Sequence, residues 1–412
     1  MMKKRTAPGL NVIFLGGFPY PRGMAGTKRI QHAIDGLKDA PDVSIRVIVL
    51  SQSSKNNVLN GTHRGIRYIT VMGDLLRWRM ALLFPLFYLK ARRALKRAYR
   101  PGCDNIIYNY GPPNLFNVGV LAYARRLGYQ VVVDVVEDYD VAMTISRSVI
   151  HRIKMAAIQH LKQRVKRLAS GIIVISSCLG EKYRELTLGA VPIHYRPISV
   201  DFSFFAGSTR TFGKIVTLFY AGSFGQKDGV PVLLDAFDCI AERRPNVRLV
   251  LTGKGSDEMM RSTLSRIAAS PFKQRIEYKG YLDDDAYYAA LSAADIPCMT
   301  RIDSAYARAG FPFKLGEFLA TGQPVVASRV SDVADLLKDQ EDAMLVSPGN
   351  PQDVVRAVEY LLDNPDFALA VGVRGRATAR RLFDLREQGR DLVAFLRTLS
   401  QVPNWQCLEE LN

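Results

Sequence analysis

The alternation of short apolar runs with helix-length segments is the feature that most limits the folds open to this sequence. In the first half, strand-like runs lie at 11–17, 44–51, 65–72, 105–110, 131–136 and 171–177. Helix-length segments separate several of them, at 27–38, 115–127 and 149–168. Apolar strands that alternate with helices form parallel sheets covered on both faces. The first half therefore predicts a doubly wound α/β domain.

The same alternation begins again after Asp201. Strand-like runs lie at 214–220, 247–252, 275–281, 296–300, 324–327 and 343–346, with helical segments at 230–243, 284–294 and 351–362. A chain of 412 residues also exceeds what one hydrophobic core usually supports. We expect an N-terminal Rossmann-like domain over 1–200 and a second over 201–384. The final helical stretch, within 385–412, is expected to pack back toward the first domain.

The excess of positive charge is confined to the first half. Residues 1–200 hold 31 Lys and Arg against 11 Asp and Glu, a net charge of +20, whereas the whole chain carries +17. The remaining residues therefore carry −3. Such an asymmetric field usually faces a polyanion, such as membrane headgroups, nucleic acid or a phosphorylated substrate.

Two stretches of the first half combine basic residues with apolar and aromatic ones. One is 77–97, and the other lies within 141–180, which contains no Asp or Glu. Such surfaces suit an anionic bilayer, where each basic residue contributes about 1 kcal/mol. The residues that we expect there are Arg77, Trp78, Arg79, Arg152 and Lys154. The alternative is a pair of core-facing helices with solvated basic faces.

Cysteine usage and hydropathy exclude several classes of protein. The five cysteines are scattered and show no zinc-binding spacing, so we expect no metal and reduced thiols. The most apolar stretch, 80–89, is interrupted by Pro85 and is far shorter than the roughly 20 residues of a membrane span. We therefore expect a cytoplasmic protein rather than a secreted or transmembrane one.

A glycine-rich turn follows the first predicted strand of the second half, in Tyr220-Ala-Gly-Ser-Phe-Gly-Gln-Lys-Asp-Gly229. Its glycines allow close backbone approach to a ligand, and the helix after it offers N–H groups to an anion. Lys227 would add a positive charge for a diphosphate. The alternative is an ordinary strand-to-helix turn. Similar strand exits follow at 253–255 and 280–283.

The strongest signal is the segment 309–328. A glycine-and-proline turn opens a short helix, Gly322 ends it, and a buried strand follows. Glu317 lies in that helix among apolar residues, where a carboxylate is costly to bury without a hydrogen-bond donor. The two adjacent hydroxyls of a ribose are such donors. The alternative is an ion pair with a neighbouring Arg or Lys.

These stretches, in this order and spacing, resemble the retaining GT-B glycosyltransferases of family 4 over about residues 10–400. The resemblance implies two Rossmann-like, doubly wound parallel-sheet domains that face a central cleft, and a nucleotide-sugar donor bound without a metal. It places Glu317 at the glutamate that holds the ribose. The residues that it assigns to the donor are Gly17, Gly222, Ser223, Lys227, Gly253, Tyr281, Leu282, Gly310, Phe311, Pro312, Lys314 and Glu317.

Two positions depart from the family pattern. Ala309 stands where the first glutamate of a Glu-x7-Glu pattern usually contacts the sugar, and Ser223 stands where an arginine is usual. The nearby cationic substitutes are Lys314, Arg308 and Arg301. The spacing of Pro312, Lys314 and Glu317 is familiar in polysaccharide-assembly branches of the family.

Two features of the first half indicate where the acceptor binds. Residues 16–26 resemble the family's flexible glycine loop, in which Arg22 could add charge; the alternative is a long, mobile loop. Glu137 and Asp138 end a predicted strand, and either could orient or deprotonate an acceptor hydroxyl. Helix capping or solvent exposure is the alternative for both. Lys227 is the third predicted catalytic residue, because it would stabilise the leaving diphosphate.

The sequence thus predicts a glycosyltransferase on the inner face of the plasma membrane. It would move a sugar from a UDP- or GDP-type donor to a lipid-linked or polysaccharide acceptor, in lipopolysaccharide or capsule synthesis. The resemblance implies retention of configuration. Two alternatives stay open: an NDP-sugar epimerase on the same fold, and a non-catalytic nucleotide-sugar-binding partner in an assembly complex. A nucleic-acid-binding protein would explain the charge but not the donor-site motifs.

Overall fold

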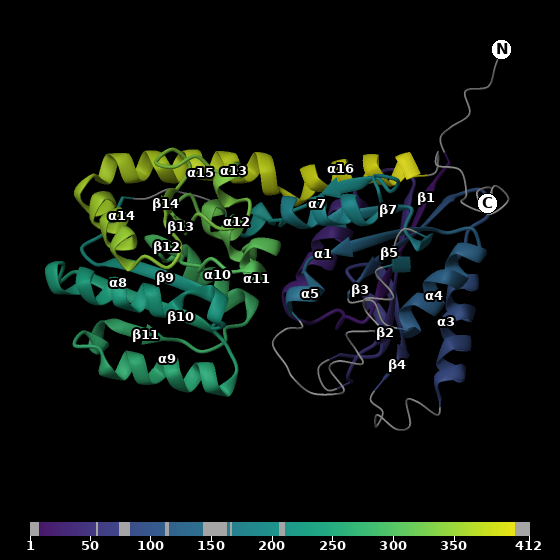
Figure 1. The fold of residues 1–412 in the computed structure, drawn as a ribbon, viewed down its shortest axis with the longest axis horizontal. Helices are drawn as coiled ribbons and strands as arrows, with labels where there is room; N and C mark the ends of the chain where they lie inside the picture. The colour runs from purple at the N-terminus through teal and green to yellow at the C-terminus, as the bar shows by residue number, and fades with distance from the viewer. Residues whose placement is uncertain are drawn as a thin grey trace, which may run out of the picture. The chain divides into compact units, whose positions relative to one another are not determined.

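The computed structural model describes residues 8–54, 57–73, 83–111, 115–142, 163–164, 167–205 and 211–399. It divides the chain into two compact units. The first comprises Met1–Pro197 together with the segment from Leu385 onward, and the second comprises Ile198–Asp384. Each unit is built around a sheet with helices packed against it (Figure 1).

The described part of the first unit forms one eight-stranded sheet in the order β3-β4-β2-β1-β5-β6-β7-β8. Its neighbouring strands are parallel, except for the antiparallel pair β3 and β4. The strands are β1 (Leu10–Gly16), β2 (Val43–Ser51), β3 (Asn60–His63), β4 (Ile66–Met72), β5 (Asp104–Tyr110), β6 (Gln130–Val135), β7 (Gly171–Val174) and β8 (Ile193–Tyr195).

Helices cover both faces of this sheet. The described helices of the unit are α1 (Ala25–Lys38), α3 (Phe84–Ala98), α4 (Leu115–Arg126), α5 (Tyr139–Ala142), α7 (Ser177–Leu186) and α16 (Leu385–Thr398). Val12 and Phe14 of β1 join a core with α1 and α16, whereas Ile13 and Leu15 join a core with α3 and α4. Because successive side chains of a strand point to opposite faces, one apolar strand serves two cores.

A buried ion pair ties α1 to the sheet of the first unit. Arg29 donates from Nε and Nη2 to the two carboxylate oxygens of Asp134, both at 2.8 Å, and the Tyr108 hydroxyl donates to the same carboxylate at 2.5 Å. Arg29 also donates to the carbonyl oxygens of Arg196 and Pro197. The guanidinium of Arg29 therefore connects α1 to β6 and to the backbone at residues 196–197.

The second unit forms a parallel six-stranded sheet among its described residues, in the order β11-β10-β9-β12-β13-β14. The strands are β9 (Val216–Ser223), β10 (Val247–Lys254), β11 (Ile276–Tyr278), β12 (Ile296–Met299), β13 (Val326–Ser328) and β14 (Met344–Val346). The chain runs outward from β9 to β11 and then returns to add β12 on the other side of β9. Ligands of doubly wound sheets bind at the carboxyl ends of strands where the order reverses in this way.

The helices of the second unit also cover two faces. They are α8 (Val230–Arg243), α9 (Asp257–Ala269), α10 (Asp284–Ser292), α11 (Ala305–Ala309), α12 (Phe313–Ala320), α13 (Val333–Leu336), α14 (Pro351–Asp363) and α15 (Pro365–Phe383). Leu218 of β9 lies in a core with α8 and α14, and the next residue, Phe219, packs against Phe318 of α12 at 6.2 Å between ring centroids. The predicted doubly wound α/β class is confirmed in both units.

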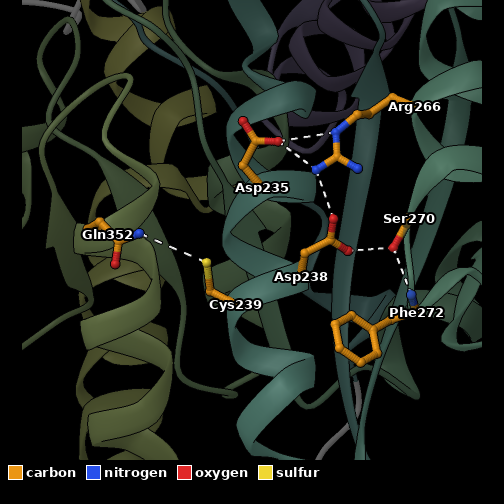
Figure 2. Close-up of polar contacts among 7 residues, drawn as sticks. All are labelled: Asp235, Asp238, Cys239, Arg266, Ser270, Phe272 and Gln352. Carbon is orange, nitrogen blue, oxygen red and sulfur yellow. Dashed lines mark hydrogen bonds and ion pairs between the residues drawn. The ribbon is translucent and has the colours of Figure 1, made fainter.

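Polar contacts fasten α9 to α8 on the outside of the second unit (Figure 2). Arg266 of α9 forms ion pairs with Asp235 and Asp238 of α8, at 2.7 and 2.8 Å. The Ser270 hydroxyl donates to Asp238 at 2.5 Å and accepts from the backbone N–H of Phe272 at 3.1 Å. This network holds the chain between α9 and β11 against α8. In the part of the chain that the structure describes, no helix is both long enough and apolar enough to cross a bilayer.

Candidate functional site

The candidate donor site lies at the carboxyl edge of the second sheet, where three predicted strand exits meet. Gly253, at the end of β10, has a φ of +131°, and a Cβ there would lie only 1.8 Å from the carbonyl oxygen of Gly222. The Gly253 N–H donates to the carbonyl oxygen of Gly280 at 2.9 Å, and the Thr252 hydroxyl donates to the same oxygen at 2.7 Å. The ends of β9 and β10 and the chain after β11 are therefore joined at one edge.

The exit of β11 presents an aromatic ring. Tyr281 is 59% exposed, and the Lys254 Nζ lies 4.7 Å from the centroid of its ring. Leu282, the next residue, is half-buried. An exposed ring beside a cation at this edge offers a flat apolar surface, which suits stacking with a nucleotide base.

The last residue of β9 and the chain that joins it to α8, residues 223–229, are called the β9 loop below. Ser223 is exposed, and its hydroxyl donates to Asp228 Oδ2 at 2.5 Å. The half-buried Lys227 places its Nζ 4.7 Å from the ring centroid of Tyr306. Gly229 has a φ of +65° and its added Cβ would lie 1.8 Å from the Thr300 carbonyl oxygen, so a larger residue does not fit.

Glu317 lies in α12, where it is only 6% exposed and is surrounded by hydrogen-bond donors. Its Oε2 accepts from the Tyr287 hydroxyl at 2.6 Å and from Lys314 Nζ at 2.9 Å, and its Oε1 accepts from the Tyr288 hydroxyl at 3.4 Å. Burial, and then the charge of Glu317, raise the pKa of both tyrosines, so both keep the protons that they donate. The ion pair with a neighbouring Lys, which the sequence left open, is present.

The turn before α12 places its side chains in the core. Ala309 ends α11 and is 1% exposed, and Phe311 is 2% exposed, with its ring centroid 5.9 Å from that of Phe383. Pro312 is the N-cap of α12, and Gly310 is half-buried. A ligand at this turn would meet backbone atoms rather than the side chains of Ala309 and Phe311.

In the first unit, Gly17 and Arg22 lie in the chain between β1 and α1. Side-chain amides hold this chain: the Tyr20 N–H donates to Gln52 Oε1 at 2.7 Å, and the Arg22 N–H donates to Asn57 Oδ1 at 2.8 Å. Asn57 Nδ2 returns a hydrogen bond to the Arg22 carbonyl at 2.8 Å. Several hydrogen bonds thus fix the backbone of the predicted glycine loop.

Glu137 and Asp138 follow β6 and have different surroundings. Glu137 is exposed, whereas Asp138 is 8% exposed and its two carboxylate oxygens accept from Lys182 Nζ of α7 at 2.7 and 2.6 Å. Asp138 Oδ1 also accepts from the N–H of Asp140 in the first turn of α5, at 3.0 Å. The arrangement at Asp138 is that of a capping residue held by a lysine, and the exposed Glu137 is the more accessible carboxylate.

The remaining predicted residues are Arg77, Trp78, Arg79, Arg152 and Lys154, which lie outside the described residues. Among the described ones, no three His, Cys, Asp or Glu side chains are placed to hold a metal ion. Sequence reasoning missed Tyr287 and Tyr288, because nothing in a Tyr-Tyr pair on one helix indicates contact with a carboxylate about 30 residues later. It also missed Lys182 as the partner of Asp138.

Comparison with known proteins connects this geometry to a family. Residues 215–364 match the model of the glycosyl transferases group 1. The chain is 32% identical over 166 residues to the phosphatidyl-myo-inositol mannosyltransferase of Mycobacterium leprae, covering 40% of this chain and 42% of the relative. The Mycobacterium tuberculosis enzyme of the same name is 28% identical over 220 residues, with coverages of 51% and 55%. The chain thus spans about half the length of the curated relatives it matches.

Solved structures resemble the chain over nearly its full length. The HepE protein of Anabaena, crystallised with UDP, superposes with a TM-score of 0.70 at 15% identity and covers 95% of this chain and 100% of its own. Sucrose-phosphate synthase of Thermosynechococcus elongatus gives 0.70 at 16% identity, with coverages of 95% and 99%. These likenesses confirm the predicted GT-B fold. Within the second unit, residues 215–364 are thus similar to the glycosyl transferases group 1.

Proposed function

We propose that this protein transfers a sugar from a nucleoside diphosphate sugar to an acceptor hydroxyl. The observation that carries the proposal is the meeting of the β9, β10 and β11 exits at the reversal point of the second sheet, within the segment that matches the family. Glycines at this edge allow a diphosphate to approach the backbone closely. The HepE structures with UDP and with UDP-glucose support a UDP-sugar donor; a GDP-sugar is the other candidate.

In this proposal the second unit holds the donor and stabilises its leaving group. Backbone N–H groups of the β9 loop and the ammonium of Lys227 would offset the charge that develops on the leaving diphosphate, without a metal. Glu317 would accept a hydrogen bond from a ribose hydroxyl, since a carboxylate accepts about four such bonds and Tyr287, Tyr288 and Lys314 already donate three. The hydrogen bonds from Tyr287 and Lys314 would hold the Glu317 carboxylate in the orientation that accepts from the ribose.

Acceptor binding is assigned to the first unit. The mannosyltransferases of Mycobacterium leprae and Mycobacterium tuberculosis are named for a phosphatidyl-inositol acceptor, which supports a lipid-linked acceptor here, and a glycan is the other candidate. The exposed Glu137 would orient or deprotonate the acceptor hydroxyl, with Asp138 and Lys182 fixing the chain beside it. Retention of configuration and a role in polysaccharide synthesis are part of the proposal.

We propose that α3 carries the membrane contact. Phe87, Ala91 and Leu95 are buried against the sheet, whereas Leu86 and Leu89 are 56% and 45% exposed. The exposed basic residues of the same helix are Lys90, Arg93, Lys96 and Arg97. Exposed apolar and basic side chains on one helix fit the interface of an anionic bilayer, so the protein would lie on the inner face of the plasma membrane.

A flotation assay with phosphatidylglycerol-containing vesicles tests the membrane contact. We expect the wild type to float with these vesicles at low salt, and Leu86→Ser with Leu89→Ser to reduce that fraction. Leu264→Ser on α9, which replaces a similarly exposed leucine in the second unit, is the matched control. Equal flotation of the α3 variant and the control would remove α3 from the proposal.

A donor screen tests the transferase itself. UDP- and GDP-sugars are incubated with the protein and release of free NDP is measured, first for the wild type and then for Glu317→Ala and the isosteric Glu317→Gln. Losing hydrogen bonds to a charged group costs about 1.5–3 kcal/mol, so we expect donor binding to weaken about tenfold to a hundredfold. Glu277→Ala removes an exposed glutamate that pairs with Lys279 and serves as the control. Unchanged turnover in both Glu317 variants would refute the ribose assignment.

A non-catalytic nucleotide-sugar-binding role is the second candidate. It is favoured by Ala309, whose methyl group is buried where the family pattern has a sugar-binding glutamate. Tight binding of an NDP-sugar without NDP release, with vesicle-bound acceptor lipids supplied, would support it over transfer. An epimerase would instead change the sugar without releasing NDP.

A further inference from the structure

The β9 loop carries a buried negative charge at the site proposed for a diphosphate. Asp228 is 6% exposed, and its Oδ2 accepts from the Ser223 hydroxyl at 2.5 Å and from the Gly225 N–H at 3.1 Å. These bonds hold the carboxylate inside the loop. A fixed carboxylate repels an approaching phosphate, most strongly where water is excluded. A cation beside Asp228 would offset this repulsion and favour binding of a diphosphate by the loop.

Arg301 is placed beside this loop by the backbone on both sides of it. It follows β12, which pairs with β9 at the reversal point of the sheet. The preceding residue, Thr300, donates from its hydroxyl to the Gly229 carbonyl at 3.1 Å, and the following residue, Ile302, donates its N–H to the Lys227 carbonyl at 3.0 Å. These two hydrogen bonds fix the exit of β12 along the β9 loop.

Among the residues that the structure describes, no acceptor atom is hydrogen-bonded to the charged Arg301 guanidinium. Its side chain is 13% exposed, and its Nε lies 3.7 Å from Asp228 Oδ1, beyond hydrogen-bond range. Burial lowers the pKa of Arg301, and Asp228 opposes that effect. Five N–H donors on a nearly buried guanidinium are costly to leave without acceptors. Phosphate oxygens are the acceptors that match this planar fork best.

The other two cationic candidates near this edge have different surroundings. Arg308 is 60% exposed and lies 3.5 Å from Asp303. Lys314 is hydrogen-bonded to Glu317 at 2.9 Å and lies 3.6 Å from the centroid of the Tyr287 ring. We propose that Arg301, positioned by Asp228, binds the diphosphate of the donor. From the chain after β12 it would supply the guanidinium that the β9 loop lacks at Ser223. This inference rests on the proposed function and assigns the phosphate contact within it.

Binding of UDP and GDP to the full-length protein tests the assignment by calorimetric titration. With the NDP that binds the wild type more tightly, Arg301→Gln is expected to weaken binding about tenfold or more, because charged hydrogen bonds are lost. Arg301→Lys should restore only part of the affinity, since an ammonium cannot bind bidentately. The affinity for the corresponding nucleoside, measured by saturation-transfer NMR, should stay unchanged. That result would show that the second unit is folded in the variant. Arg308→Gln is the matched control.

A double variant separates direct contact from simple neutralisation of Asp228. If Arg301 binds phosphate, Arg301→Gln still weakens NDP binding about tenfold when Asp228→Asn is already present. If Arg301 only offsets the aspartate, its loss has no effect in that background, and the assignment is overturned. Wild-type affinity in the single variant Arg301→Gln overturns it as well, while leaving the proposed function intact. Failure of the wild type to bind either NDP would overturn the proposed function together with this inference.

Discussion

Replacing Gly253 with alanine tests whether the edge of the second sheet depends on close backbone contact. The φ of +131° at this residue is rare for L side chains, and such backbone strain costs about 1–3 kcal/mol. The added Cβ would also lie 1.8 Å from the Gly222 carbonyl oxygen. Because β9 and β10 must move apart to accept it, the overpacking adds about 1–3 kcal/mol. We expect Gly253→Ala to destabilise the second unit by about 4 kcal/mol.

Gly280 provides the matched control, since it also has a positive φ, +67°, but an added Cβ there meets nothing within 4 Å. Gly280→Ala should cost only the left-handed backbone penalty of about 1–2 kcal/mol. For a unit of this size, 1 kcal/mol shifts Tm by about 2–4 °C, so calorimetry should show losses of about 12 °C and about 5 °C respectively. NDP affinity, measured well below both transitions, should fall more in Gly253→Ala. Equal Tm losses in the two variants would refute the close-contact argument.

Three further outcomes follow from contacts away from the donor site. Burial, followed by the charge of Arg196, lowers the pKa of His194 from 6.5 to about 4, so the unfolded chain takes up a proton before the folded one. The free energy of unfolding should therefore fall by up to about 3 kcal/mol as the pH drops from 6.5 to 4. His194→Phe keeps a ring stacked on Phe395, and in urea titrations its free energy of unfolding should depend less on pH over this range. Asp134→Asn should destabilise the first unit by about 3–5 kcal/mol in the same assay, because it leaves the charge of Arg29 buried; a loss below about 1 kcal/mol would contradict this. Arg266→Met, at the α8–α9 network, should cost about 1 kcal/mol or less and leave NDP binding unchanged, whereas a loss of affinity would show that this network supports the site.

The strongly apolar strands could be predicted because burial on both faces leaves a continuous signal. The run at 11–17 became β1 (Leu10–Gly16), and 247–252 became part of β10. The strand β3 was missed, since its residues Asn60–His63 are mostly exposed and polar. It is held by backbone pairing to β4, and it has no apolar side chain to mark it in the sequence. β8 was missed for a similar reason, because it has only three residues and none is fully buried.

The parts of the candidate site that glycine spacing indicates could be predicted from the sequence. The contacts between side chains that lie far apart in the sequence could not. Gly222 and Gly253 could be assigned to one edge because parallel strands end together. Nothing in the sequence joins Tyr287 to Glu317, or Arg301 to Asp228, since these pairs form only when separate helices and strands pack. Arg301 could be named as one of three cations near the motif, but choosing among the three required their burial and contacts.

The two departures from the family pattern have different structural consequences. At Ser223 the proposed replacement for the missing guanidinium is Arg301, which lies against the same loop because its neighbours Thr300 and Ile302 are hydrogen-bonded to that loop. At Ala309 the side chain is buried at the end of α11 beside the apolar Phe311, so the position itself offers no polar group to a sugar. In the proposed function, phosphate contacts are therefore retained while a sugar contact is lost. An NDP-sugar should then bind only about as tightly as the corresponding NDP, and an NDP-sugar that binds a hundredfold more tightly would show that residues outside the family pattern hold the sugar.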